Sequence, residues 1–335
     1  MNIIIPMAGR GTRLRPHTIT IPKPLLPVAG KPIVQRLVED IVKTLNTKIE
    51  NIGFIIGDFG AETEQQLLEV ARQEGAQGHI FYQTQPLGTA HAILCAAEML
   101  QGEVVIAFAD TLFKADFELN AAADGIIWTH RVADPSNFGV VKLNAQNVIT
   151  EFVEKPTTFV SDMAIIGIYY FKDGAYLRNE LQYLLDNDIK DKGEYQLTSA
   201  LENMKQKGTN FTIASVAEWL DCGNKDATIY TNQRVLEFCK ARNEQLISDS
   251  VVIQNAVIIE PCFIASDVVL HNSVVGPHVS IGKGSKIENS VVSNSIIQQK
   301  TTIKNKVIAN ALIGSHTIVK GKAEDYSLGD YSTLS

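Results

Sequence analysis

The chain has 335 residues, of which 45% are hydrophobic and 20% are charged, and its formal net charge is −7. This length exceeds one ordinary hydrophobic core, so two domains are expected, and the negative charge argues against a nucleic-acid partner. The sequence has no run of about 18 uncharged apolar residues, which excludes a membrane-spanning helix and argues against a membrane partner.

The compartment is indicated by the start of the chain and by its cysteines. The first residues form an expected strand, with no basic leader or cleavage site before it, so we expect a cytoplasmic protein. The four cysteines, Cys95, Cys222, Cys239 and Cys262, are scattered along the chain without paired metal spacing. Neither a disulfide framework nor a zinc site is therefore expected.

A loop rich in glycine, proline and basic residues follows the expected strand at residues 2–6. It reads MAGRGTRLRP from Met7 and PKPLLPVAGKP from Pro22. Glycines lack a Cβ atom and let backbone N–H groups approach anionic oxygens, while Arg13 and Lys23 supply fixed positive charge. The loop is therefore predicted to bind phosphate.

Two other phosphate-binding loops fit this segment poorly. A dinucleotide-binding loop requires a third small residue where this chain has Leu14, and the prolines that follow make an immediate helix unfavourable. A P-loop requires a Gly-Lys-Ser or Gly-Lys-Thr triplet, which is absent. A turn in which the glycines are purely structural remains the alternative.

Short apolar runs then alternate with helical periodicity, which is typical of a doubly wound α/β fold with a mostly parallel sheet. The clearest helix spans about 34–45, where six apolar residues fall on one face. They are Val34, Leu37, Val38, Ile41, Val42 and Leu45. Further strands are expected at 52–56, 79–83 and 104–109, and further helices at about 61–73 and 90–100.

The expected strand at 104–109 is a continuous apolar run that ends in Asp110. Such a run is typical of a central parallel strand. Open α/β sheets bind their ligands at the carboxyl ends of the strands, so Asp110 is a candidate metal ligand. A solvated loop acid or a helix cap is the alternative for this residue.

From about residue 250 an aliphatic or aromatic residue recurs at roughly every sixth position. The series is Val251, Val257, Phe263, Val269, Val275, Ile281, Ile287, Val292, Ile297, Ile303, Ile308, Ile313 and Val319. This hexapeptide repeat predicts a left-handed parallel β-helix whose stacked coils bury these side chains. The expected organisation is a domain at 1–225, a linking helix at 226–248, the β-helix at 249–322 and a tail at 323–335.

Several motifs occur in one order along the chain, and together they resemble the sugar-1-phosphate nucleotidyltransferases, also called NDP-sugar pyrophosphorylases. The motifs lie at residues 7–32, 83–92, 138–140, 154–156, 166–169, 193–198 and 219–223. The resemblance covers essentially the whole chain. The C-terminal repeat resembles the tail of long-form glucose-1-phosphate thymidylyltransferases.

The resemblance implies four groups of site residues. The nucleotide is expected to contact Ala8, Gly9, Gly11, Thr12, Gln83, Gly88 and Thr89. The sugar phosphate is expected to contact Gly139, Glu154, Lys155, Gly167 and Glu194. The catalytic residues implied are Arg13, Lys23, Asp110 and Lys155, and the residues implied to hold Mg²⁺ are Asp110 and Asp221. The amide of Gln83 can match the edge of a pyrimidine because it offers both a donor and an acceptor.

The implied reaction joins a nucleoside triphosphate to a sugar 1-phosphate. A phosphate oxygen of the sugar attacks the α-phosphorus in line, and pyrophosphate leaves, so that positioning and charge neutralisation supply the acceleration. We expect dTTP or UTP with glucose 1-phosphate, and Mg²⁺ as the cofactor. The alternatives are an N-acetylglucosamine-1-phosphate uridylyltransferase and a catalytically silent regulator that binds nucleotide sugars.

The repeat could also form a second active site, because acyltransferases with hexapeptide repeats use a histidine as base. His271, His278 and His316 are the candidates for that role. The repeat is short and contains no long loop that could build an acyl-donor site. We therefore expect it to serve oligomerisation or regulation, which makes a homo-oligomer the predicted assembly.

Overall fold

The computed structural model describes residues 1–335 except 10, 46, 116–122, 323–326 and 334–335. The chain divides into two compact units. The N-terminal unit comprises Met1–Leu26 and Lys31–Ala227, and the C-terminal unit comprises Pro27–Gly30 and Thr228–Ser335. Part of the expected tail, at 323–326 and 334–335, lies outside the described residues. Within the described part of the chain, no helix has the length and hydropathy needed to cross a membrane.

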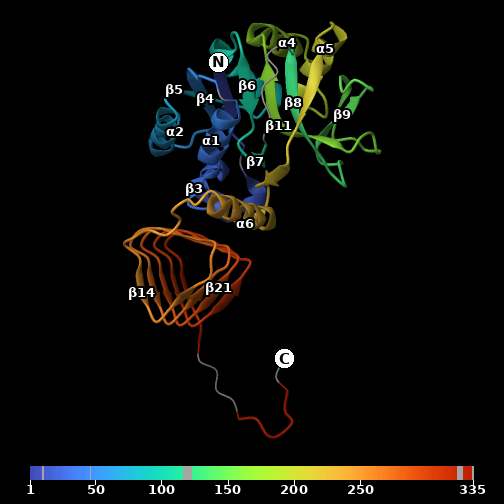
Figure 1. Cartoon of the computed structure of the whole chain (residues 1–335). Coiled ribbons are helices and arrows are strands. Elements are labelled where there is room, and N and C mark those ends of the chain that lie inside the picture. Colours follow the sequence, from blue (N-terminus) through green and yellow to red (C-terminus); the bar gives the residue numbers. More distant parts are fainter. Residues whose placement is uncertain (10, 46, 116–122, 323–326, 334–335) are drawn as a thin grey trace. The chain divides into compact units, whose positions relative to one another are not determined.

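Nine of the described strands of the N-terminal unit form one mixed sheet. Its main path is β10 (Ile149–Glu154), β9 (Gly139–Leu143), β11 (Met163–Phe171), β6 (Val104–Ala107), β1 (Asn2–Pro6), β4 (Asn51–Ile56) and β5 (Gln77–Tyr82). Beside this path, β8 (Gly125–Arg131) pairs with β11 and with β12 (Phe211–Ser215). The ladders that join β6, β1, β4 and β5 are parallel, whereas β11 runs antiparallel to β6. Figure 1 shows β5 near one side of this unit and β9 near the other.

Helices cover this sheet, and two of them occupy the segments at 34–45 and 61–73 in which helices were predicted. The described helices of this unit are α1 (Ile33–Leu45), α2 (Ala61–Gln73), α3 (Thr89–Leu94), α4 (Gly174–Asp186) and α5 (Leu197–Gln206). The helix expected at 90–100 is shorter than predicted, because Ala96 adopts φ −106° and ψ 34° and the chain continues as a single 3₁₀ turn at Ala97–Met99. On α1, the predicted apolar face is buried at Val34, Leu37 and Ile41.

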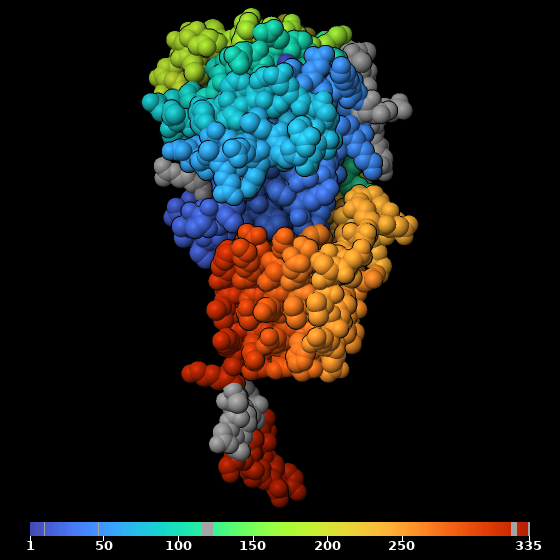
Figure 2. Space-filling view, turned by 90° about the vertical axis from the view of Figure 1, so that its left-hand side faces the viewer, coloured from blue at the N-terminus to red at the C-terminus, as the bar shows by residue number. Residues whose placement is uncertain are grey.

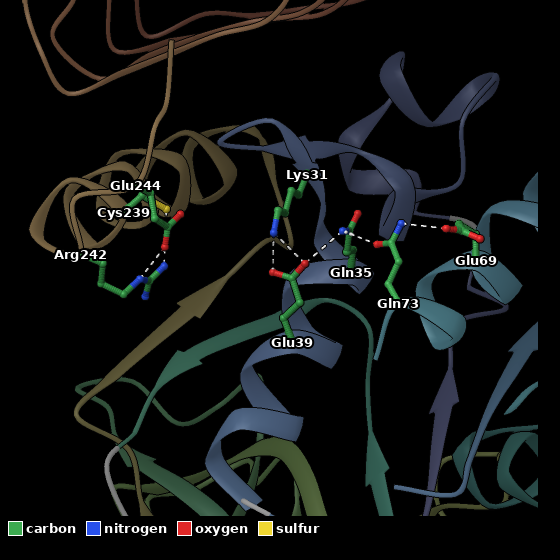
Figure 3. A network of polar contacts seen from close by, with 8 residues as sticks. All are labelled: Lys31, Gln35, Glu39, Glu69, Gln73, Cys239, Arg242 and Glu244. Carbon is green, nitrogen blue, oxygen red and sulfur yellow. Dashed lines mark hydrogen bonds and ion pairs between the residues drawn. The ribbon is translucent and has the colours of Figure 1, made fainter. Parts of the chain in front are cut away.

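A polar network ties the solvent-facing sides of α1 and α2 together (Figure 3). The ammonium of Lys31 donates to Glu39 Oε1 at 2.8 Å and to Oε2 at 2.9 Å. The amide of Gln35 donates to Glu39 Oε1 at 3.0 Å and to Gln73 Oε1 at 3.2 Å. Gln73 in turn donates to Glu69 Oε1 at 3.0 Å. These contacts fix the two helices to each other beside the parallel half of the sheet.

The expected linking helix is α6 (Lys225–Ala241), which ends earlier than the predicted residue 248. The backbone of Asn243 adopts φ +56°, and the N–H of Glu244 donates to the carbonyl of Cys239 at 3.0 Å. This left-handed residue after the last turn is a common way to end a helix. Arg242 Nε donates to Glu244 Oε1 at 2.6 Å and so reinforces the turn (Figure 3).

Beyond α6, short strands stack into three parallel sheets, which confirms the β-helix predicted from the repeat (Figure 1). The first sheet contains β14 (Val252–Gln254), β17 (Val269–His271), β20 (Lys286–Glu288), β23 (Thr302–Lys304) and β26 (Ile318–Lys320). The second contains β15 (Val257–Ile258), β18 (Val274–Val275), β21 (Val291–Ser293) and β24 (Val307–Ala309). The third contains β16 (Cys262–Ile264), β19 (Val279–Ile281), β22 (Ser295–Ile297) and β25 (Leu312–Ile313). The coils form a continuous outer surface in Figure 2.

The core of the β-helix follows the predicted series from Val275 onward, but three earlier members of the series were assigned wrongly. Instead of Val257, Phe263 and Val269, the core contains or contacts Ile258, Ile264 and Leu270. Val257 itself is 57% exposed. Leu270 and Val275 are five residues apart. Counting back from Val275 in steps of six therefore gives positions one residue before the side chains that point inward. A displacement of one residue in a strand moves every side chain to the opposite face.

The segment Pro27–Gly30 packs as part of the C-terminal unit, although it lies near the start of the chain. The N–H of Ala29 donates to Oδ1 of the buried Asn232 at 2.8 Å. Gly30 adopts φ +85°, and a Cβ atom there would lie 2.2 Å from the ring of Phe263. Only glycine fits this position without displacing the ring.

Candidate functional site

A cavity of about 390 Å³ lies at the carboxyl ends of three parallel strands of the N-terminal unit, β1, β5 and β6. Eleven of the residues predicted for the site line it: Ala8, Gly9, Gly11, Thr12, Arg13, Lys23, Gln83, Gly88, Thr89, Asp110 and Glu194. Ligands of open α/β sheets bind at this edge. The strand order therefore brings together segments that are far apart in the sequence.

The predicted phosphate loop forms one wall of this cavity. Gly11 adopts φ +57°, and its carbonyl accepts from the N–H of Leu14 at 3.0 Å and from the hydroxyl of Thr18 at 2.7 Å. A Cβ atom on Gly11 would lie 3.0 Å from Cβ of Lys23. The loop thus passes through 3₁₀ turns at Thr12–Leu14 and His17–Ile19 and brings Lys23 against Gly11.

Lys23 and Asp110 form an ion pair across the cavity wall, with Nζ 3.0 Å from Oδ2. The side chain of Lys23 is only 10% exposed, whereas that of Asp110 is 44% exposed. A buried ammonium requires a compensating charge. Asp110 supplies that charge and keeps part of its carboxylate open to the cavity.

Asp221 lies beside Asp110 because their strands are neighbours. In the antiparallel pair of β13 (Glu218–Asp221) and β7 (Thr111–Lys114), Asp221 lies opposite Thr111, and the N–H of Cys222 donates to the carbonyl of Asp110 at 3.0 Å. Burial raises the pKa of the Asp221 carboxyl, the charge of Asp110 raises it further, and Lys23 opposes both effects. Gly223, two residues after Asp221, lines the cavity.

The two carboxylates fit the requirements of Mg²⁺ rather than those of a fully protein-bound metal. Within the described residues, no group of three or more His, Cys, Asp or Glu side chains is placed to hold a metal ion. Mg²⁺ prefers oxygen ligands and commonly takes one or two carboxylates, with substrate phosphates and water completing its shell. Asp110 and Asp221 supply such a pair.

The segment around Gly88 packs closely on the segment around Tyr195. Tyr195 donates its N–H to the carbonyl of Leu87 at 2.9 Å, and its carbonyl accepts from Ala90 at 2.9 Å. Gly88 adopts φ +116°, and a Cβ atom there would lie 2.4 Å from the carbonyl oxygen of Tyr195. The hydroxyl of Thr89 accepts from the N–H of Leu197 at 2.8 Å. The expected base-binding and sugar-binding motifs are therefore joined by backbone contacts.

Gly139, Glu154 and Lys155 form a second cluster near the end of β9 and β10. Gly139 pairs with Glu154, and a Cβ atom on the glycine would lie 3.1 Å from Glu154 Oε2. Thr198 donates to Glu154 Oε2 at 3.3 Å, and Lys155 Nζ lies 3.7 Å from Oε1. Gly167 lies apart from them, beside Phe108, which lines the cavity. Among the described residues that line the cavity, none of these four predicted sugar-site residues occurs, and neither does Asp221.

Lys192 is a residue of this cluster that the sequence analysis missed. Its ammonium donates to the carbonyl of Glu154 at 3.0 Å and to that of Lys155 at 2.9 Å. Lys155 adopts φ +42°, a strained conformation for a residue with a side chain. Lys192 thus holds the turn that carries the predicted sugar-phosphate lysine. Lys192 directly precedes the motif at 193–198, but that position alone does not indicate its contacts with Glu154 and Lys155.

The C-terminal unit has a groove of about 590 Å³ along one side of the coils. A ladder of asparagines lines it, in which Asn255 donates to Asn272, Asn272 to Asn289 and Asn289 to Asn305. No histidine is found among the described residues that line this groove. His278 instead lies with Nε2 3.1 Å from Glu237 Oε1. The described lining of this groove therefore includes none of the three histidines considered in the sequence analysis.

Comparison with known proteins identifies the family. The nucleotidyl transferase family model matches residues 2–237. The chain belongs to this family. The predicted α/β fold and family resemblance are therefore confirmed. The bifunctional protein GlmU of Methanococcus aeolicus is 32% identical over 262 residues, which cover 78% of this chain and 60% of that protein.

Other nucleotidyl transferases match more of their own length. The glucose-1-phosphate thymidylyltransferase of Streptomyces antibioticus is 28% identical over 325 residues, covering 90% of this chain and 88% of that protein. A putative glucose-1-phosphate thymidylyltransferase from Bacillus anthracis, solved in complex with a sucrose, superposes with a TM-score of 0.58 at 24% identity. The superposition covers 69% of this chain and 93% of that chain. At this identity the likeness supports a shared fold.

Proposed function

We propose that this chain is a magnesium-dependent sugar-1-phosphate nucleotidyltransferase, which releases pyrophosphate from a nucleoside triphosphate. The observation that carries the proposal is the single cavity in which a glycine-rich loop, Arg13, Lys23 and Asp110 meet. These features suit a triphosphate, because they supply backbone N–H groups, fixed positive charge and a carboxylate for the metal. The name of the Streptomyces relative, a glucose-1-phosphate thymidylyltransferase, is consistent with this class of chemistry.

In the proposed reaction the protein positions two phosphates and neutralises their charge. Gly9, Gly11 and Thr12 would hold the triphosphate through backbone N–H groups, while Arg13 stabilises the pyrophosphate that leaves. Lys155 would orient the sugar phosphate for in-line attack on the α-phosphorus. A sugar phosphate is already nucleophilic near neutral pH, so no general base is required. When bound, Mg²⁺ neutralises the phosphoryl oxygens.

The favoured substrates are dTTP or UTP with glucose 1-phosphate. Gln83 lines the cavity and can pair with a pyrimidine edge, and the Streptomyces relative is named for thymidylyl transfer to glucose 1-phosphate. Uridylyl transfer to N-acetylglucosamine 1-phosphate is the second candidate, because one methyl group in an apolar contact discriminates thymine from uracil only weakly.

The deciding experiment measures pyrophosphate release from dTTP, UTP, CTP, ATP and GTP against several sugar 1-phosphates, with Mg²⁺ and with a chelator. We expect release that requires both Mg²⁺ and one sugar phosphate. Tight binding of a nucleotide sugar without release from any pair would overturn the proposal and favour the silent regulator.

For the C-terminal unit we propose a role in homo-oligomer formation. Its exposed strand residues include Val257, Val291 and Val307 of one sheet of the β-helix, which are 57%, 41% and 82% exposed. Light scattering of the full chain tests this role. A particle of monomer mass at micromolar concentration would contradict it.

A further inference from the structure

The amide of Gln83 is held by two contacts behind the cavity wall. Its Nε2 lies 3.2 Å from the carbonyl oxygen of Gly88 and 3.2 Å from Nδ1 of His91. A backbone carbonyl can only accept a hydrogen bond, so the nitrogen end of the amide must face Gly88. The reversed orientation would bring two carbonyl oxygens together. The contact with Gly88 therefore leaves the oxygen end of the Gln83 amide, Oε1, available for a ligand.

His91 completes this arrangement from helix α3. Because Gln83 Nε2 is a donor, Nδ1 of His91 must accept, which places the ring proton on Nε2 and leaves the imidazole neutral. The ring is half-buried, and burial lowers the pKa of His91, which favours the same neutral form. Of the described residues that line the cavity, Gln83 is one and His91 is not. The histidine therefore acts on a ligand only through Gln83.

These two contacts use both amide protons of Gln83. The group left for a ligand is Oε1, which is an acceptor. Uracil and thymine present an N–H donor at ring position N3, whereas cytosine presents a bare acceptor nitrogen at the same place. An acceptor on the protein is complementary to the N3–H donor of uracil or thymine, and it repels the acceptor N3 of cytosine.

We propose that His91 is the positioning residue that makes this site select uracil or thymine over cytosine, by fixing Gln83 with Oε1 toward the base. The inference rests on the proposed function, which supplies a nucleotide as the ligand. It assigns the choice of base to a side chain that does not contact the base. One buried acceptor left without a donor predicts a preference for UTP over CTP of roughly 10²-fold.

The test compares the binding of UTP and CTP to the folded full-length protein by calorimetry, without sugar phosphate. His91→Leu removes the acceptor and frees the amide to rotate, so we expect the UTP-to-CTP ratio of affinities to fall by about 10-fold or more. His91→Asn places an amide oxygen where Nδ1 was, and we expect it to retain most of the ratio. His79→Leu is the matched control, since His79 contacts Asn51 on the same sheet. It should leave the ratio unchanged.

A second measurement uses the unaltered protein and so does not depend on the folding of a variant. UTP methylated at N3 lacks the donor, and we expect it to bind about as weakly as CTP. A folded His91→Leu protein with the normal ratio, or equal binding of UTP and N3-methyl-UTP, would overturn the inference. A preserved preference for UTP without any pyrophosphate release would instead uphold it and refute the transferase proposal.

Discussion

The ammonium of Lys23 lies 3.0 Å from Oδ2 of Asp110, although the two residues are 87 positions apart in the sequence. One is predicted to bind a phosphate and the other a metal ion. Their pairing satisfies both charges when neither ligand is present. Binding of a magnesium nucleotide would give each residue a new partner, phosphate for Lys23 and metal for Asp110, so the two exchanges are expected to occur together.

Replacing Asp110 by Asn should therefore lower turnover strongly, and it should also lower folding stability because the buried Lys23 loses its compensating charge. The amide keeps the size of the side chain but loses the charge that holds Lys23 and the metal, and we expect kcat to fall about 10²- to 10³-fold. Steady-state kinetics over a range of Mg²⁺ concentrations would measure this loss. Asp162→Asn, which breaks a surface pair with Arg131, is the control and should leave kcat unchanged. Normal turnover of Asp110→Asn would remove Asp110 from the metal site.

Replacing Arg13 by Ala should reduce turnover while leaving nucleotide affinity nearly unchanged. The guanidinium is expected to stabilise charge that develops on the leaving pyrophosphate, and the loss of one such donor lowers kcat by about 10²-fold or more. The measurement is kcat and KM for the nucleotide at saturating sugar phosphate. Arg15→Ala, an exposed change in the same loop, is the control. Unchanged turnover with the Mg²⁺ dependence of the unaltered protein would contradict the assignment.

Gly88→Ala should destabilise the protein and weaken nucleotide binding. Gly88 adopts φ +116°, and an added Cβ atom would lie 2.4 Å from Tyr195 O and 2.7 Å from Tyr195 N. Gly208→Ala is a matched control, because Gly208 adopts φ +98° with no atom within 4 Å of the added Cβ. Backbone strain alone costs about 1–3 kcal/mol, so the control isolates the collision. Denaturant unfolding should show a larger loss for Gly88→Ala, and equal losses would refute the close approach.

Lys192→Ala should raise KM for the sugar 1-phosphate without changing nucleotide affinity. Lys192 donates to the carbonyls of Glu154 and Lys155, so its loss frees the turn that presents Lys155. We expect a rise of about 10-fold, the effect of roughly one lost charge-assisted hydrogen bond. The neighbouring Lys190→Ala, which removes a pair with Asp188, is the control. A rise in KM for the nucleotide alone would show that the cluster serves another ligand.

His91 should make the folded protein less stable in mild acid. Burial lowers the pKa of His91 below the ordinary value of 6.5. Just below that pH, His91 is therefore protonated in the unfolded chain but still neutral in the folded chain. The free energy of unfolding should therefore fall as the pH drops through this range. Relative to His91→Asn, the unaltered protein should lose stability as the pH falls below the ordinary imidazole pKa of 6.5. Denaturant melts of both proteins would measure the difference, and a constant gap between them would contradict the expected shift.

The phosphate-binding loop of the site could be predicted from the sequence because its residues are close together along the chain. The glycines, Arg13 and Lys23 occupy one loop, and Asp110 ends an apolar run that identifies a central strand. The cavity brings these residues together as predicted. Their roles toward ligands remain predictions.

Other features depended on tertiary geometry that periodicity does not contain. Nothing in the spacing of Lys192 indicates that its ammonium reaches back to the carbonyls of Glu154 and Lys155. In the repeat, one five-residue interval displaced the predicted inward series, since a strand responds to a single-residue shift by exchanging its faces. The separation of Glu154 and Lys155 from the cavity wall likewise depends on how β9 and β10 end.

The four residues Pro27–Gly30 belong to the C-terminal unit, and this has a consequence for synthesis of the chain on a ribosome. Gly30 leaves the ribosome more than 200 residues before its partner Phe263, a delay of roughly 10–50 s at about 5–20 residues per second. During that time the residues on both sides of this short segment can fold as part of the N-terminal unit. The segment itself cannot yet pack against the β-helix, which has not been synthesised. A fragment ending near residue 227 would carry these four residues with no partner to bury them.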